Sequence, residues 1–279
     1  MANDPRAAVQ TARPHSIPAK LDSIVVVTPL LAVFLSVSLT ASLPRSSPAA
    51  PADSPRRLGA IGMPDPSTAS LLVSYYDQFL RDQDLEEFRR QVNARYIEGT
   101  LARLTEAPDT HTRRAAVFAL GLVGTYQANG SAARALRDPD PTVRSLAENA
   151  LWAIWFRADT PENNTELERI GLLISHRRFE DAIGRATRLI ERAPTFAEVY
   201  NQRAIAHFNL GQFQESADDC RRVLERNPFH IGALAGLAKC LLRLEKREDA
   251  LEALRRSSRL QPFNVELRNV ISELENGDD

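Results

Sequence analysis

The side chains that most often carry chemistry are few in this chain, and they are not grouped. The five histidines stand singly: His15, His111, His176, His207 and His230. The only two cysteines are Cys220 and Cys240. A structural zinc site needs about four ligands close together. This spacing therefore predicts no metal centre.

Acidic pairs and glycine motifs do not indicate catalysis either. Asp218-Asp219 and Glu248-Asp249 are neighbours on predicted helices, so their side chains point about 100° apart and cannot hold one substrate between them. The chain lacks the sequence motifs of nucleotide-binding loops, serine hydrolases, zinc proteases and kinases. Gly121 and Gly124 fall inside a helical pattern and predict close packing. We expect a protein that is not an enzyme, with no cofactor and no small-molecule substrate.

The most regular feature of the chain is a period of 34 residues. It is marked by Pro194, Pro228 and Pro262. Between these prolines, apolar residues recur at steps of three and four, which is typical of two amphipathic helices per unit. A fixed period predicts stacked units that bury their apolar faces against one another. The second unit shows the pattern in full: Tyr200, Ala204, Gly211, Phe213, Ala217, Cys220, Val223 and Pro228.

These units resemble three tetratricopeptide repeats, at about 163–196, 197–230 and 231–264 within 163–262, followed by a capping helix at 263–275. The resemblance implies an all-α fold, a right-handed α-α superhelix of helical hairpins. It also implies a non-catalytic scaffold that binds a peptide or protein. The sequence departs from the family pattern at four positions: Arg169, Arg203, His207 and Ser216.

In that family the first helix of each repeat lines a concave groove. By register, the exposed positions are Leu167, Gly171 and Ile174, then Asn201, Ile205 and Phe208, then Ala235, Lys239 and Leu242. A clamp for a peptide carboxylate needs several charge-assisted donors, and this groove offers only Asn201, Lys239 and Arg243. We therefore predict a mainly apolar groove. Its candidate partner-binding residues are Asn201, Ile205, Phe208, Lys239, Leu242 and Arg243.

A second period of 31 residues lies upstream, within a predicted helical region at 67–160. The Pro-Asp turns at 108–109 and 139–140 each precede a helix with an early arginine, Arg113 or Arg144. This region resembles short HEAT-like repeats, in which that arginine commonly ties adjacent repeats through an acidic turn residue. Earlier residues predict helices at 69–80 and 85–104.

Three aromatic residues, Trp152, Trp155 and Phe156, end the second HEAT-like unit. We expect them to pack at the junction with the first tetratricopeptide helix; the alternative is an exposed aromatic site for a partner. The two cysteines fall on predicted helix faces that meet when hairpins stack. They are expected to be buried free thiols, or a disulfide if the domain is exported and their Cα atoms lie within about 7 Å.

Charge argues against nucleic acid as a partner. The chain has 35 lysines and arginines against 36 aspartates and glutamates. Affinity for nucleic acid depends on a positive surplus that faces the phosphates, and arginine pairs such as Arg221-Arg222 are interleaved with acids. We expect a protein or peptide partner and no nucleic acid.

The N-terminus predicts export or membrane anchoring. A basic segment at 1–22, expected to be disordered, precedes an uncharged segment at 23–43 that contains an apolar run of 16 residues at 24–39. This order is typical of a signal peptide or an anchor. A linker rich in Pro, Ser and Ala follows at 44–66. The alternative is a cytoplasmic protein with a disordered extension.

The full chain is accordingly expected to sediment with membranes, or to be recovered outside the cytoplasm without its first ~40 residues. Each buried CH2 of the apolar segment contributes about 0.8 kcal/mol. A chain that starts at Asp65 should remain in the soluble fraction. Cell fractionation with mass spectrometry of the N-terminus tests this, and unprocessed full chain found only in the soluble cytoplasm would contradict it.

Two classes of function are consistent with the sequence. The first is an adaptor that holds a peptide or protein partner in the groove. The second is a regulatory or maturation subunit, with the HEAT-like region docked on an enzyme and the tetratricopeptide repeats on a substrate. A pull-down from the membrane fraction separates them, because only the second requires a stoichiometric enzyme.

Overall fold

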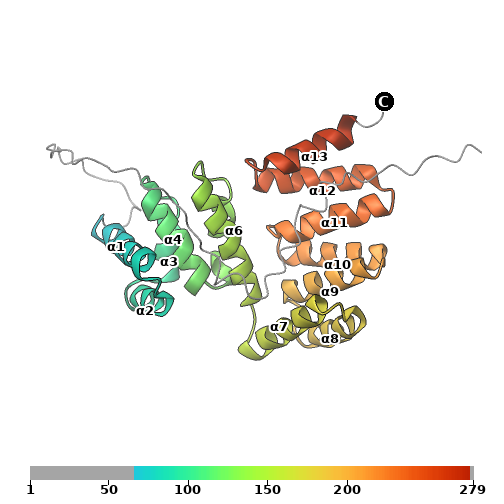
Figure 1. The fold of residues 1–279 in the computed structure, drawn as a ribbon, viewed down its shortest axis with the longest axis horizontal. Helices are drawn as coiled ribbons and strands as arrows, with labels where there is room; N and C mark the ends of the chain where they lie inside the picture. Colours follow the sequence, from blue (N-terminus) through green and yellow to red (C-terminus); the bar gives the residue numbers. More distant parts are fainter. Residues whose placement is uncertain (1–65, 277–279) are drawn as a thin grey trace, which may run out of the picture.

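The computed structural model describes residues 66–276, and within this range every regular element is a helix (Figure 1). The predicted all-α solenoid of helical hairpins is confirmed. The predicted segments at 1–22 and 23–43, and the linker up to residue 65, lie outside the described residues. None of the described helices is long and apolar enough to cross a membrane.

The N-terminal part is built from six α-helices and one short 3-10 helix. They are α1 (Pro66–Asp82), α2 (Leu85–Arg95), α3 (Glu98–Leu104), α4 (Thr110–Val123), η2 (Tyr126–Ala128), α5 (Asn129–Ala135) and α6 (Pro141–Phe156). Rings from α1, α2 and α4 meet in one core, where the Phe79 and Phe118 centroids are 4.7 Å apart. The prediction of one helix over 85–104 is wrong, because the chain turns extended at Tyr96 and Ile97 between α2 and α3.

Both predicted Pro-Asp turns start a helix. Asp109 accepts a hydrogen bond from the Thr112 amide at 2.7 Å, and Asp140 accepts one from the Val143 amide at 2.9 Å. Such side-chain caps satisfy amide groups that the helix leaves unpaired. The helices that they open, α4 and α6, pack closely, since a Cβ on Gly121 would lie 3.0 Å from the Cα of Ala150. The predicted packing role of Gly121 is confirmed.

The two early arginines are structural, as the HEAT-like pattern predicts. Arg113 donates from Nε and Nη2 to the Asp138 carboxylate at 2.7 and 3.1 Å, and from Nη1 to two carbonyl oxygens of the preceding turn. Arg144 donates to the carbonyl oxygens of Asp138 and Pro139. Asp138 is buried, so this bidentate pair fixes one turn against the next.

The C-terminal part consists of three helical hairpins and a final helix. The hairpins are α7 (Pro161–Ser175) with α8 (Phe179–Arg192), α9 (Ala197–Asn209) with α10 (Phe213–Arg226), and α11 (Ile231–Arg243) with α12 (Arg247–Leu260). The final helix is α13 (Val265–Asn276), which packs on α12. Small residues lie where the helices of a hairpin cross, and Ala204, Ala217 and Ala250 are buried there.

The 34-residue period is visible in the backbone itself. Arg177, Gly211 and Glu245 are spaced by 34 residues, and all three have positive φ, at 59°, 76° and 59°. Each stands just after the first helix of its hairpin. The amide that follows donates back to a carbonyl oxygen five residues earlier, for example from Gln212 to His207 at 3.0 Å. Glycine adopts this left-handed conformation without strain, so the sequence signal was clearest at Gly211.

The helix of the N-terminal part that faces the C-terminal hairpins is α6 (Figure 1). The chain bends after α6, so α7 and α8 lie at one end of the molecule while α6 runs beside the hairpins that follow. The N-terminal core accordingly extends to Ile231 at the start of α11. As a result, α6 forms one wall of the space along the inner face of the hairpins.

Candidate functional site

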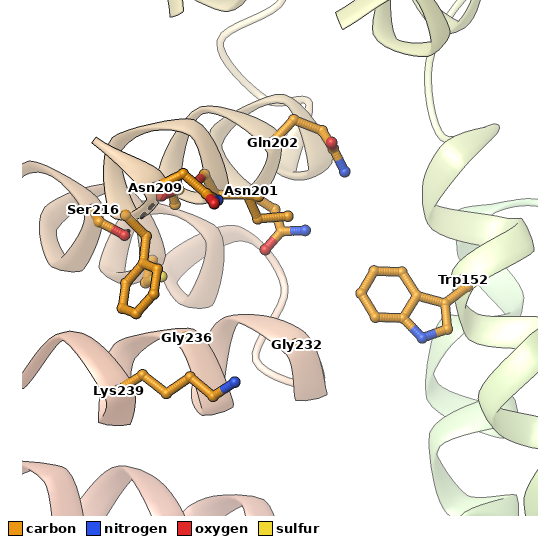
Figure 2. Close-up of a pocket in the computed structure, with 12 residues that line it drawn as sticks. Trp152, Asn201, Gln202, Asn209, Ser216, Gly232, Gly236 and Lys239 are labelled. Carbon is orange, nitrogen blue, oxygen red and sulfur yellow. Dashed lines mark hydrogen bonds between the residues drawn. The ribbon is translucent and has the colours of Figure 1, made fainter. Parts of the chain in front are cut away.

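A pocket of about 80 Å³ opens on the inner face of the hairpins, between α9 and α11 (Figure 2). Its apolar wall includes Ile205 and Phe208 from α9, and its floor includes Gly232 and Gly236 from α11. Trp152 approaches from α6 across the opening. The glycines lie one turn apart on the same face of α11, and their missing side chains let Trp152 and the Cys220 sulfur approach that face closely.

Four of the six predicted binding residues line this pocket together: Asn201, Ile205, Phe208 and Lys239. The other two do not. Leu242 is half-buried against the C-terminal core. Arg243 is exposed, with its guanidinium 4.2 Å from the centroid of the Phe213 ring.

The polar groups of the pocket are mostly committed to internal hydrogen bonds. Asn201 is only 4% exposed, and its Nδ2 donates to Glu198 at 2.8 Å. The Asn209 amide donates to the Ile205 carbonyl oxygen at 2.8 Å. The expectation of an exposed donor at Asn201 is therefore wrong, since Glu198, itself buried, needs that donor.

The expected groove positions in the first hairpin are also wrong. Leu167, Gly171 and Ile174 are buried. Leu167 and Ile174 belong to the core between α7, α8 and α9. The exposed stripe of α7 includes Leu172 instead, so the predicted register is displaced by one position. Ala235 in the third hairpin is likewise buried.

Trp152 was not among the predicted pocket residues. Its Cη2 atom would lie 2.7 Å from a Cβ placed on Gly232, so only glycine at that position allows this approach. The sequence contains no local signal for the contact, because the two residues are 80 positions apart. A glycine pair spaced by four, at 232 and 236, was the available hint that another segment approaches one face of this helix closely.

Comparison with known protein families agrees with both halves of this architecture. Residues 97–169 match the model for HEAT repeats, and residues 197–230 match the model for the tetratricopeptide repeat. This chain joins HEAT-like repeats to a tetratricopeptide repeat array. The second hairpin, α9–α10, which carries Ile205 and Phe208, is the repeat that the family model matches.

Curated relatives are similar to parts of the chain. A TPR repeat-containing protein of Rhizobium etli is 28% identical over 138 residues, covering 50% of this chain and 68% of the relative. Sperm-associated antigen 1 of Mus musculus is 31% identical over 97 residues, covering 35% of this chain and 11% of the relative. A protein SGT1 homolog of Oryza sativa is 39% identical over 77 residues, covering 27% and 21%.

Among solved structures, the TPR2AB-domain:pHSP90 complex of yeast Sti1 is similar with a TM-score of 0.38 and 19% identity. The match covers 75% of this chain and 99% of that one. YrrB, a TPR protein with an unusual peptide-binding site, gives a TM-score of 0.37 and 18% identity, covering 71% and 98%.

One face of α6 joins the HEAT-like part to the tetratricopeptide array. Its residues are spaced by three or four positions: Arg144, Glu148, Trp152 and Trp155. The guanidinium of Arg144 lies 4.5 Å from the centroid of the Phe263 ring, and Gln261 donates to Glu148 at 3.4 Å. Burial raises the pKa of Glu148 above its usual value. This face of α6 thus contacts the loop after α12, at Gln261 and Phe263, and the loop after α10, at His230.

The centre of this interface is a buried polar cluster around His230. The His230 ring stacks on Trp155 with centroids 4.1 Å apart and meets Trp152 edge-on at 5.4 Å. Nδ1 accepts a hydrogen bond from the Ala233 amide, so Nε2 carries the proton that is donated to Glu198 at 2.9 Å. Glu198 also accepts from Asn201 and Gln202. All the hydrogen bonds that the Glu198 carboxylate accepts thus come from side chains of this buried cluster.

A second set of bonds crosses the same interface. Asn129 donates across it to Asn227 at 2.9 Å, and Asn129 is itself held within the N-terminal part by Trp155 Nε1, which donates to it at 2.8 Å. The Tyr126 hydroxyl donates to the Arg226 carbonyl oxygen at 2.8 Å. The expectation that the tryptophans pack on the first tetratricopeptide helix is wrong, because their partners are at the start of α11. The alternative of an exposed aromatic site is also wrong, since both indoles are buried. Phe156 is partly buried and packs against both the N-terminal core and the core between α7, α8 and α9.

The departures from the family pattern have internal partners. Arg203 forms a bidentate pair with the buried Asp219, both bonds at 2.7 Å, and this pairing raises the pKa of Arg203. Ser216 donates to the Ala204 carbonyl oxygen and accepts from the Cys240 thiol.

Both cysteines are free and buried, as expected, and burial raises the pKa of each thiol. No metal-binding group of three His, Cys, Asp or Glu occurs within residues 66–276.

Proposed function

We propose that this chain is a non-catalytic scaffold that holds a peptide segment of a protein partner at the pocket between α9, α11 and α6. The observation that carries the proposal is the apolar pocket itself. It lies on the inner face of the array, where Phe208 and Ile205 are only half-buried and line the pocket. A concave apolar surface with few polar groups suits a peptide with apolar anchors.

The size of the pocket favours an aliphatic anchor. Its volume is about 80 Å³. An engineered apolar cavity of about 150 Å³ accommodates benzene. The present pocket is therefore suited to a side chain of the size of valine or leucine, with the rest of the segment lying along the inner face.

The charges of the pocket do not favour a peptide carboxylate. Of the three donors expected in the groove, Asn201 is bound to Glu198 and Arg243 lies over Phe213, outside the pocket. Lys239 is the one charged residue among the described residues of the lining. A buried anion needs several charge-assisted donors, so the partner segment should be apolar at its anchor.

The decisive experiment compares Phe208→Ala with Lys239→Ala, using a partner identified by cross-linking from the native membrane fraction. Phe208→Ala should weaken binding by at least about 1 kcal/mol, roughly fivefold, because a central aromatic contributes most to such an interface. Lys239→Ala should cost about 0.5 kcal/mol. Isothermal titration calorimetry gives both values.

Val265→Ala is the control, since Val265 is exposed on α13, away from the pocket. It should bind like the unchanged chain, and circular dichroism should show that all three variants remain folded. A larger loss for Lys239→Ala than for Phe208→Ala would indicate an acidic ligand. Unchanged binding in both variants would exclude the pocket as the binding site.

A further inference from the structure

A second hollow, of about 520 Å³, lies on the first hairpin of the array, away from the pocket described above. It is lined by side chains of α7, α8 and the turn between them: Arg169, Leu172, Leu173, His176, Arg178, Asp181, Arg185 and Arg188. On α8 the charged members recur at steps of three or four, so they form one stripe along the helix. Four arginines thus surround two leucines, with one aspartate among them.

This hollow belongs to an end of the array that no other described helix covers. α9 packs against both α7 and α8. On their other side no helix follows in Figure 1, where the two helices form the lower end of the molecule. Repeat arrays normally close with a polar outer face, yet Leu172 is 43% exposed here. An exposed leucine within a ring of arginines is an unusual end surface.

The positive charge of the hollow is only partly balanced. Arg169 and Arg185 share one carboxylate, Glu166, at 3.2 and 2.9 Å. Arg178 pairs with Asp181 at 2.8 Å. Arg188 is exposed and forms no ion pair with any residue in 66–276. Four guanidinium groups therefore face two carboxylates, and each guanidinium has donors to spare.

We propose that this hollow, the α7–α8 end site, binds a short acidic segment of a partner protein that places an aliphatic side chain against Leu172. Carboxylates would meet the arginines in bidentate pairs, and the aliphatic side chain would cover the exposed leucine. The site is separate from the pocket at Phe208, so either can exist without the other.

The surroundings of the α7–α8 end site favour a short peptide over nucleic acid. The same two helices also carry Glu162, Glu168, Glu180 and Glu191. Over residues 161–192, which include the turn between the two helices, six arginines are matched by six acidic residues. A long phosphate backbone would meet those glutamates on leaving the hollow, whereas a peptide of a few residues stays within it.

The segment comes from another protein and not from the chain's own N-terminus. Residues 1–65 contain four aspartates, no glutamate and six basic residues. The aspartates stand singly, at positions 4, 22, 53 and 65. No stretch there offers the clustered acids that four arginines require.

The test uses the full chain and a fluorescein-labelled peptide, Glu-Asp-Glu-Leu-Glu-Asp-Glu, in a fluorescence anisotropy titration at low salt. Arg178→Glu/Arg188→Glu should weaken binding at least tenfold, because two attractions become repulsions. A peptide with serine in place of leucine should bind several-fold more weakly. Binding should also fall as salt rises, since screening shortens the range of exposed charges.

The matched control is Arg221→Glu/Arg222→Glu on α10. These arginines form exposed pairs with Asp218 and Glu225, at the same three-residue spacing as Arg178 with Asp181. The control should change peptide binding less than twofold. Equal loss in both double variants would mean general charge attraction and would overturn the proposal.

Two other results would also overturn it. A single-stranded oligonucleotide that binds more tightly than the peptide, and loses affinity in Arg178→Glu/Arg188→Glu, would assign the site to nucleic acid. Self-association that this variant abolishes, seen by analytical ultracentrifugation in the absence of peptide binding, would assign it to a second copy of the chain.

Discussion

Replacing His230 with alanine is expected to lower the free energy of unfolding by about 3–5 kcal/mol. The ring is completely buried between Trp152 and Trp155, and large-to-small changes at packed sites cost about 2–5 kcal/mol. The change also removes the donor at 2.9 Å from Glu198, whose side chain has no contact with solvent. A buried acceptor that loses its partner adds to the cost. Urea unfolding followed by circular dichroism measures the sum.

The two tryptophans give this variant a second readout. They are the only ones in the chain, and both belong to the interface between the HEAT-like part and the array. If His230 holds the two parts together, the variant should show red-shifted tryptophan emission at a urea concentration where most helix remains. His176→Ala is the control, because His176 is exposed at the residue that follows α7, and it should cost less than about 0.5 kcal/mol. A stability loss without an emission shift would contradict the interface role.

The repeats could be predicted from the sequence because their signals are local. A helix and its neighbour in a hairpin are fixed by apolar residues three or four apart, and the 34-residue spacing of Pro194, Pro228 and Pro262 repeats that pattern. The role of Arg113 followed for the same reason, since its partner Asp138 lies in the next turn of a repeated motif. Such information is contained within one or two units.

The pocket could be predicted only in part. Phe208 and Ile205 were found from the register of a single helix, and both line the pocket. Asn201 was misread as a free donor, because its partner Glu198 is held by His230, and that contact depends on how α6 meets the array. Contacts between distant segments leave no periodic trace in one sequence.

The face of α6 that meets the array shows why this interface was missed. Trp152 and Trp155 were expected to be buried, but Arg144 and Glu148 continue the same stripe with charged residues. A helix face that is half charged is normally a solvent face. Here the charged half packs on Phe263 and Gln261 through a ring contact and a hydrogen bond, which hydrophobic periodicity cannot detect.

The register inside the array gives the second large prediction. Leu241 on α11 is 2% exposed and belongs to the core formed with α10, α12 and α13. Leu241→Asp should therefore lower the free energy of unfolding by at least about 3 kcal/mol, because it buries a charge without a partner and removes apolar contacts. Urea unfolding followed at 222 nm gives this value directly.

Val265→Asp is the control for Leu241→Asp, because it introduces the same charged residue at an exposed position. Val265 is 56% exposed and begins α13, where an acidic residue is favourable beside the positive end of the helix dipole. This variant should stay within about 0.5 kcal/mol of the unchanged chain. If Leu241→Asp were equally well tolerated, α11 would have to be rotated from the position described here. The same rotation would move Gly232, Gly236 and Lys239 out of the pocket, so the stability measurement also tests the proposed site.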